Sequence, residues 1–108
     1  MIQKKFSPTN CRVTFEAPEE IAQGADTLYL VGDFNQWDAH ATPMNRHKRN
    51  KFTVTLNLEP NREYQYRYLV NGQVWYSEKN ADKLAPNPFF SQNSVVSTSP
   101  TEALQATV

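Results

Sequence analysis

The sequence predicts an all-β fold, an immunoglobulin-like β-sandwich of six to seven short antiparallel strands. Three observations favour this fold. Apolar residues mostly alternate with polar ones, which is the period of a half-buried strand. Turn residues separate the alternating segments at short intervals, as they do in such sandwiches. No long segment has the helical period, and 108 residues suit one domain with one modest core.

The alternating segments can be placed in order along the chain. Segment 11–17 puts Cys11, Val13 and Phe15 on one face, and segment 27–32 (TLYLVG) follows after a loop. Segment 51–60 has its threonines outward and four apolar side chains inward: Phe52, Val54, Leu56 and Leu58. Segment 93–98 (NSVVST) is the expected last strand. We therefore predict a sandwich module over residues 1–98 and a polar tail over 99–108.

Segment 63–70 (EYQYRYLV) is the most regular of the expected strands. Its period of two places Gln65, Arg67 and Leu69 on one face and three tyrosines on the other. The tyrosines are expected in the core with Phe15, Leu30, Val54 and Leu56: Tyr64, Tyr66 and Tyr68.

The turn at Asn71-Gly72 decides where the next segment, 74–77, points its side chains. A two-residue loop would pair Tyr68 with Trp75 and bury the indole among the tyrosines. A three-residue loop, with Gly72 at positive φ, places Trp75 on the face of Arg67 and moves Val74 and Tyr76 to the tyrosine face. We favour the three-residue loop because it keeps Arg67 out of the core, although a slip of one residue would invert the assignment.

The turn VGDFNQWD, residues 31–38, contains a large aromatic residue among polar ones. Trp37 can either fold back over the core or stand in solvent as a platform for a flat ligand. Exposed indoles cover the C–H face of a pyranose ring, and Arg, Asn and Ser can bind the hydroxyl rim. Judged by spacing alone, a core role is the commoner fate of both Trp37 and Trp75.

Three stretches of the chain together resemble a known family. They are YLVGDFNQWD, YQYRYLVNGQVW and PNPFFSQNSVVS, and they resemble the starch- and glycogen-binding module of carbohydrate-binding family 48 over residues 10–98. Such modules occur in isoamylases, in branching enzymes and in the β subunit of the AMP-activated protein kinase. The resemblance implies the early-set type of immunoglobulin-like sandwich and non-catalytic binding of α-1,4-linked glucan.

The resemblance also implies roles for individual residues. Trp37 and Trp75 match tryptophans that stack on glucose rings, which favours the platform role for Trp37 and makes Phe34 the core residue of its turn. Four further positions match residues that contact the glucan: Arg67, Phe89, Ser91 and Asn93. The chain departs from the family at Glu78-Lys79, where many members have Asp-Pro, and at Phe90-Ser91, where isolated bacterial modules have two glycines.

Composition excludes several other classes of function. Eleven basic and eleven acidic residues cancel, so no bulk charge draws the chain to nucleic acid or to an anionic membrane. Cys11 is the only cysteine, and neither His40 nor His47 has metal-ligand spacing, so we expect no disulfide, metal or cofactor. No motif nominates a catalytic pair, and we expect no enzymatic activity. The N-terminus lacks a signal sequence, and the expected location is cytoplasmic.

The leading interpretation is therefore a module that binds glycogen, starch or maltooligosaccharides and targets a protein partner to them. The alternative is a protein-interaction module that has kept the fold and lost sugar affinity. A third interpretation is binding of single-stranded nucleic acid through the aromatic platforms and the basic segment 46–51. We expect that basic segment to be a solvated hairpin tip.

Overall fold

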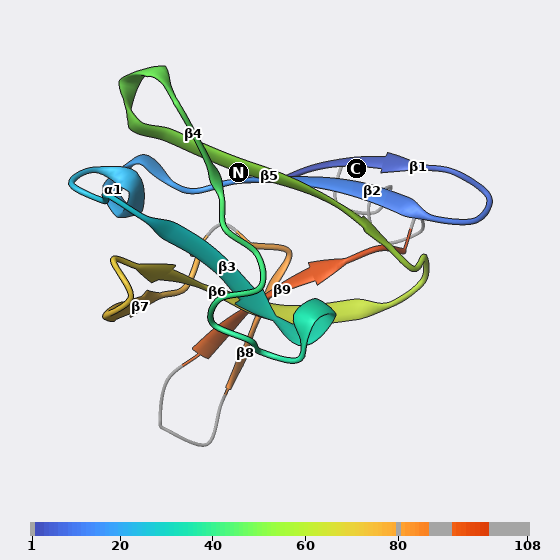
Figure 1. Cartoon of the computed structure of the whole chain (residues 1–108). Coiled ribbons are helices and arrows are strands. Elements are labelled where there is room, and N and C mark those ends of the chain that lie inside the picture. Colours follow the sequence, from blue (N-terminus) through green and yellow to red (C-terminus); the bar gives the residue numbers. More distant parts are fainter. Residues whose placement is uncertain (1, 80, 87–91, 100–108) are drawn as a thin grey trace.

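The computed structural model describes residues 2–79, 81–86 and 92–99 and shows a sandwich built almost entirely of strands (Figure 1). Its one α-helix, α1, is a single turn at Glu19–Ala22, and two 3-10 turns lie at Asp33–Asn35 and Lys48–Asn50. The strands are β1 (Ile2–Phe6), β2 (Cys11–Glu16), β3 (Leu28–Gly32), β4 (Asn45–His47), β5 (Lys51–Leu58), β6 (Glu63–Val70), β7 (Val74–Tyr76), β8 (Lys83–Pro86) and β9 (Gln92–Ser97).

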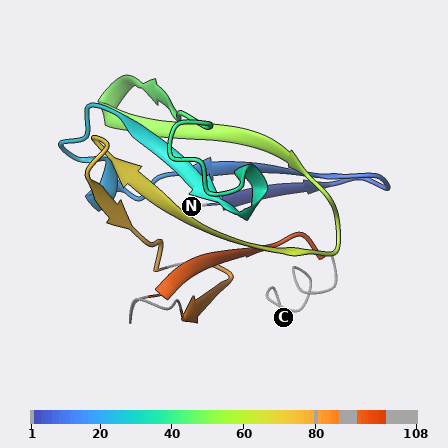
Figure 2. The same cartoon turned by 60° about the horizontal axis from the view of Figure 1, so that its bottom comes forward.

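The strands form two antiparallel sheets that face each other. One sheet has the order β1-β2-β5-β4, and the other has the order β3-β6-β9-β8 with β7 added to β6. Strand β6 lies between β3 on one side and β7 and β9 on the other, as the turned view in Figure 2 shows. Strand β6, which carries Arg67, is therefore the strand of the second sheet that pairs with the most neighbours.

The core lies between the two sheets and follows the expected alternation. Cys11, Val13 and Phe15 of β2 are fully buried, and so are Tyr66 and Tyr68 of β6. The neighbouring rings meet edge to face, with centroids 5.1 Å apart for Phe15 and Tyr66 and 5.9 Å apart for Tyr66 and Tyr68. Three residues expected in the core pack against it while only partly buried: Val54, Leu56 and Tyr64. The predicted sandwich fold is confirmed.

The described residues contain nine strands rather than the six or seven expected. The additional ones include β1, β4 and β8, each of which lies at an edge of its sheet. Edge strands need only one hydrogen-bonded neighbour, and their outer positions can be polar, so their sequences alternate weakly. In β1, for example, no residue is fully buried. Backbone pairing rather than hydrophobic pattern defines these strands.

The β6–β7 hairpin has the predicted three-residue loop. Tyr68 pairs with Tyr76 and Leu69 pairs with Trp75 across the hairpin. Asn71 and Gly72 both have positive φ, and the Asn71 side chain accepts hydrogen bonds from the backbone N–H groups of Asp26 and Thr27. The loop is thus fastened to the segment that precedes β3, which fixes the register of β7.

The expected burial of the inward side of β7 is wrong. Val74 and Tyr76 share the face of Tyr68, as predicted, but they are 45% and 42% exposed. Strand β7 has three residues and pairs with β6 alone, so it lies at the margin of the sheet, where cover from the opposite sheet is incomplete.

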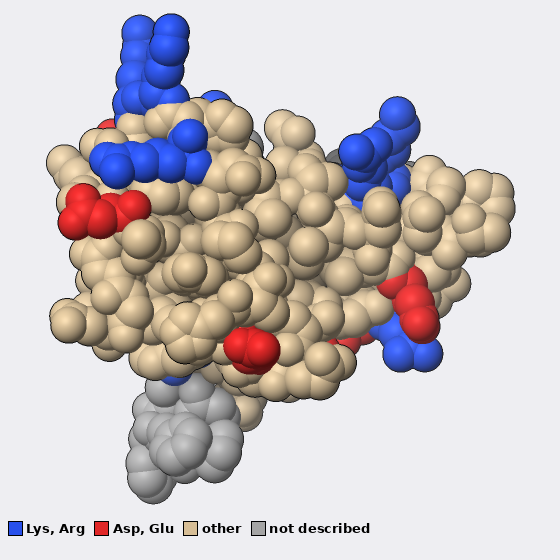
Figure 3. All heavy atoms as spheres, in the orientation of Figure 1, with Lys and Arg blue, Asp and Glu red and all other residues tan. Residues whose placement is uncertain are grey.

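The basic segment forms the tip of the β4–β5 hairpin, as expected. Its side chains are exposed, and Figure 3 shows lysine and arginine gathered there. Arg46 donates to the Asn50 side chain at 2.8 Å and lies 5.7 Å from the centre of the Phe52 ring. The hairpin belongs to the sheet that does not carry Trp75, so this charge lies away from the tryptophan-bearing strand.

Gly32, the last residue of β3, allows an unusually close approach of two strands. A Cβ atom built there would lie 2.4 Å from the backbone oxygen of Gln65 and 2.8 Å from the Cβ atom of Tyr66. We expect Gly32→Ala to lower the free energy of unfolding by about 3 kcal/mol, because the two strands must separate. Gly24→Ala is the matched control, since Gly24 has φ +81° and no neighbour within 4 Å, and it should cost about 1 kcal/mol. Urea unfolding of both variants measures the difference, and equal losses would contradict the packing explanation.

Candidate functional site

The outer face of the β6 sheet carries three of the six residues expected to bind sugar, Arg67, Trp75 and Asn93. Gln65, Arg67 and Leu69 alternate along it, opposite Val95, Val31 and Trp75 respectively. Val31, Leu69 and Val95 are buried but do not belong to the core cluster between the sheets. The face therefore has an apolar floor from which polar side chains and one indole rise, and the apolar residues of this floor were not anticipated as part of the site.

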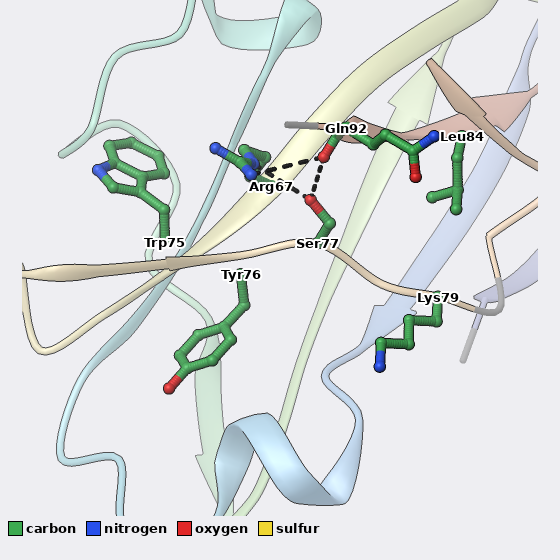
Figure 4. Close-up of a pocket in the computed structure, with 7 residues that line it drawn as sticks. All are labelled: Arg67, Trp75, Tyr76, Ser77, Lys79, Leu84 and Gln92. Carbon is green, nitrogen blue, oxygen red and sulfur yellow. Dashed lines mark hydrogen bonds between the residues drawn. The ribbon is translucent and has the colours of Figure 1, made fainter. Parts of the chain in front are cut away.

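Among the described residues, Trp75 is the most exposed aromatic residue of this face. It is 42% exposed, and its indole N–H has no hydrogen-bond partner among the described residues. Figure 4 shows its ring standing above β7 on the same side of the strand as Arg67. The structure thus confirms the predicted register and solvent access of Trp75.

Arg67 is held beside Trp75 by two neighbouring elements. Its Nε donates to the Ser77 hydroxyl at 3.1 Å, and its Nη2 lies 3.5 Å from the backbone oxygen of Gln92 (Figure 4). The Ser77 hydroxyl also donates to the Gln92 oxygen at 2.5 Å. These contacts fix the guanidinium plane over the junction of β7 and β9 while the side chain remains partly exposed. Ser77 and Gln92 were not expected in the site, since they lie far apart in sequence and no motif connects them.

Trp37 lies in a tightly bonded turn after β3. Gln36 and Trp37 have φ of +55° and +57°, a left-handed conformation that bulky residues rarely adopt. The Asn35 side chain closes the turn by accepting from the Gly32 N–H and donating to the Leu30 oxygen and the Thr42 hydroxyl. Turn geometry rather than core packing therefore fixes the backbone under the indole.

The Trp37 side chain is partly buried and is tied to β6 through Asp33. One carboxylate oxygen of Asp33 accepts the indole Nε1–H at 2.8 Å, and the other accepts the backbone N–H of Gln65 at 2.7 Å. Strand β3 ends at Gly32, so the Asp33 side chain, rather than a backbone oxygen of a longer β3, accepts the Gln65 N–H. Phe34, from the same turn, packs on Phe15 and Tyr64 with centroids 5.8 and 6.2 Å apart, as expected.

Asn93 reaches the site from β9 but offers little surface. It is buried, and its Nδ2 donates to the Gln65 side-chain oxygen at 3.0 Å. Gln65 is consequently oriented by Asn93 on one side and anchored through Asp33 on the other. The remaining two expected site residues, Phe89 and Ser91, lie outside the described residues.

Glu78, one of the departures from the family, has a structural role. Its carboxylate accepts a hydrogen bond from the Tyr68 hydroxyl at 2.6 Å. Its backbone N–H donates to the Ser94 hydroxyl, and that hydroxyl donates in turn to the Glu78 backbone oxygen. Burial, with the neighbouring Tyr66 and Glu78 adding to it, raises the pKa of Tyr68, so this hydroxyl stays a donor. The segment after β7 is thereby fixed to β9, which brings Ser77 within reach of Arg67.

The described residues lack the features of two other kinds of site. They contain no group of three or more His, Cys, Asp or Glu side chains that could hold a metal ion. None of the helices in this part of the chain has the length and apolarity needed to span a bilayer.

Comparison with known proteins matches the sequence of this chain to a known family. Residues 20–101 match the family described as the glycogen recognition site of AMP-activated protein kinase. A 50-residue segment is 42% identical to 5'-AMP-activated protein kinase subunit beta-1 of Sus scrofa; it covers 46% of this chain and 38% of that subunit. The family match spans most of the sandwich, including both tryptophans and Arg67. The chain therefore belongs to the family of glycogen recognition modules found in AMP-activated protein kinase.

Proposed function

We propose that this module binds α-1,4-linked glucan, such as glycogen, starch or maltooligosaccharide, on the outer face of the β6 sheet and that it has no catalytic role. The observation that carries the proposal is the exposed Trp75 beside the fixed guanidinium of Arg67. A pyranose ring has an apolar face that an indole can cover and a hydroxyl rim that a guanidinium can bind. Membership of a glycogen-recognition family supports the same ligand.

Each expected residue has a distinct part in the proposal. Trp75 and Trp37 stack on sugar rings, and Arg67 donates hydrogen bonds to hydroxyl groups. Asn93 acts mainly by orienting Gln65, whose side chain lies on the same face, because little of Asn93 is exposed. Phe89 and Ser91 complete the proposed set on the strength of their positions in the family pattern.

We also propose that the module places a protein partner on the glucan. The matched relative is named as a subunit of a kinase, and the aligned segment covers 38% of it. The basic β4–β5 tip belongs to the opposite sheet, so a protein bound there would leave the sugar face open. The predicted boundary between a module at 1–98 and a tail at 99–108 and the cytoplasmic location both remain predictions.

Retention on polysaccharide tests the central proposal. The purified chain should bind amylose or insoluble starch and should pass through cellulose, whose β-linked chains present a different shape. Elution by maltoheptaose would establish that the same site takes soluble chains. Retention on neither polymer would overturn glucan binding and would favour the protein-interaction module.

We expect the affinity for maltoheptaose to change less than about twofold between 50 and 500 mM NaCl. The reason is that stacking and hydrogen bonding to neutral hydroxyls release no counterions. A site that used the basic tip to bind phosphates would instead lose affinity by orders of magnitude over that range. Calorimetric titration of maltoheptaose at both salt concentrations decides between a sugar-binding site and a phosphate-binding site. An oligothymidylate is titrated in parallel as the polyanion.

A further inference from the structure

Strand β7 exposes three consecutive apolar side chains, and the proposed function uses only one. Val74, Trp75 and Tyr76 are 45%, 42% and 42% exposed, although β7 is an edge strand that pairs with β6 alone. Such runs on an edge strand invite association and are uncommon without a ligand or partner. The stacking role of Trp75 leaves the exposure of Tyr76 unexplained.

A hollow at the edge of β7 connects Tyr76 to the sugar face. It has a volume of about 630 Å³ and is lined by Arg67, Trp75, Tyr76, Ser77, Lys79, Leu84 and Gln92 (Figure 4). Successive side chains of a strand point to opposite sides, so Trp75 and Tyr76 cannot lie on one face. Figure 4 shows Tyr76 and Lys79 on one side of the chain, and Trp75, Arg67 and Ser77 on the other. The hollow therefore opens around the edge of the strand.

Lys79 gives the Tyr76 side a polar group suited to hydroxyls. It is exposed, and the described residues include no hydrogen-bond or ion-pair partner for its ammonium. Tyr76 and Lys79 resemble the combination of Trp75 and Arg67, because each pair has one flat ring and one cation with N–H donors.

The shape of the ligand decides whether both sides can be occupied at once. In an α-1,4-linked glucan the axial bond at C1 turns each ring relative to the last, and the chain curves. A β-1,4-linked glucan extends as a flat ribbon. Only a curved chain that lies on Trp75 can continue around a narrow strand and reach Tyr76.

We propose that Tyr76 and Lys79 form a second glucan subsite around the edge of β7, which makes the module prefer long, curved α-1,4-linked chains. This proposal rests on the proposed function, because Trp75 and Arg67 hold the first part of the chain. A short oligosaccharide fills the Trp75 side alone, and a longer one engages both sides.

Titration of two chain lengths tests the subsite. Covering one face of a tyrosine ring removes roughly 50 Å² of apolar surface, which corresponds to about an eightfold change in affinity. Tyr76→Ala should therefore weaken maltoheptaose binding about eightfold and leave maltotriose binding unchanged. Val74→Ala is the matched control, since Val74 is equally exposed on the same strand face but does not line the hollow. It should change neither affinity.

Two further variants keep the result interpretable. Tyr76→Phe retains the ring and should bind maltoheptaose within about twofold of the unmodified chain. Lys79→Ala should lower only maltoheptaose affinity, by roughly threefold, the scale of one solvent-competed hydrogen bond. Melting curves on all variants confirm that the fold is intact.

The outcomes separate this proposal from the one on which it rests. If the unmodified chain binds neither sugar, glucan binding fails and the subsite fails with it. If it binds both and Tyr76→Ala weakens both equally or neither, only the subsite is wrong. Sedimentation adds a third outcome: a dimer that Tyr76→Ala dissociates would assign the exposed strand to self-association and would overturn the subsite.

Discussion

Combined replacement of Trp37 and Trp75 by alanine is expected to abolish measurable binding of maltoheptaose while the sandwich stays folded. Covering one indole face with sugar carbons removes roughly 60 to 100 Å² of apolar surface, worth about 2 kcal/mol. The two tryptophans lie on different elements, so their losses should add to about 4 kcal/mol, close to a thousandfold. An open groove of this kind binds at roughly 10 μM to 1 mM, and the variant falls outside that range.

The control for this result is the corresponding pair of phenylalanine variants. Phenylalanine keeps a flat apolar ring of smaller area, so part of the affinity should return. Both pairs should melt within a few degrees of the unmodified chain, with Trp37 contributing the larger shift because its indole is partly buried and bonded to Asp33. Affinity that survives the alanine pair would remove both tryptophans from the site. Loss of affinity together with a collapse in melting temperature would show instead that Trp37 supports the core.

Tyr66→Ala is expected to lower the free energy of unfolding by about 4 kcal/mol, the scale of an aromatic-to-alanine change in a closed core. Tyr66 is fully buried, and its ring meets those of Phe15 and Tyr68 edge to face. Phe15 belongs to β2 and Tyr68 to β6, so the cavity left by the alanine would lie between the two sheets. For a domain of about 100 residues such a loss lowers Tm by more than 15 °C.

Tyr66→Phe isolates the contribution of the ring from that of the hydroxyl. Phenylalanine preserves the ring contacts, and the change should cost about 1 kcal/mol or less. Urea denaturation of both variants supplies the comparison. Similar losses for Ala and Phe would mean that the hydroxyl, rather than the packing of the rings, makes the larger contribution.

The sequence predicts the parts of the fold that combine burial with strict alternation. Strands β2, β5 and β6 follow from the period of two, and the register of β7 follows from keeping Arg67 out of the core. Strands β1, β4 and β8 could not be predicted, because their pairing depends on a neighbour's backbone rather than on their own side chains. The exposure of Tyr76 was also not predictable, since periodicity gives the face of a residue but not how far the opposite sheet extends.

In the candidate site, too, some residues could be predicted from the sequence and others could not. Trp37, Trp75 and Arg67 are nominated for the proposed site by the family resemblance, since spacing alone favours a core role for both tryptophans. The groups that hold them are not visible. Ser77 and Gln92 meet Arg67 only because Glu78 and Ser94 join the segment after β7 to β9. Asp33 could have been suspected from its place in the tryptophan turn, but its bond to Gln65 depends on β3 ending at Gly32.

The Asp33 carboxylate has a thermodynamic consequence for the stacking proposed for Trp37 and Trp75. Because it accepts the indole N–H of Trp37 and is itself held by β6, that ring is already confined to one orientation before any sugar arrives. Trp75 has no such restraint among the described residues and must lose rotamer freedom on binding, at a cost of about 0.5 to 1.5 kcal/mol. Two rings of equal area should therefore differ in enthalpy–entropy balance, with stacking on Trp37 entropically less costly than stacking on Trp75.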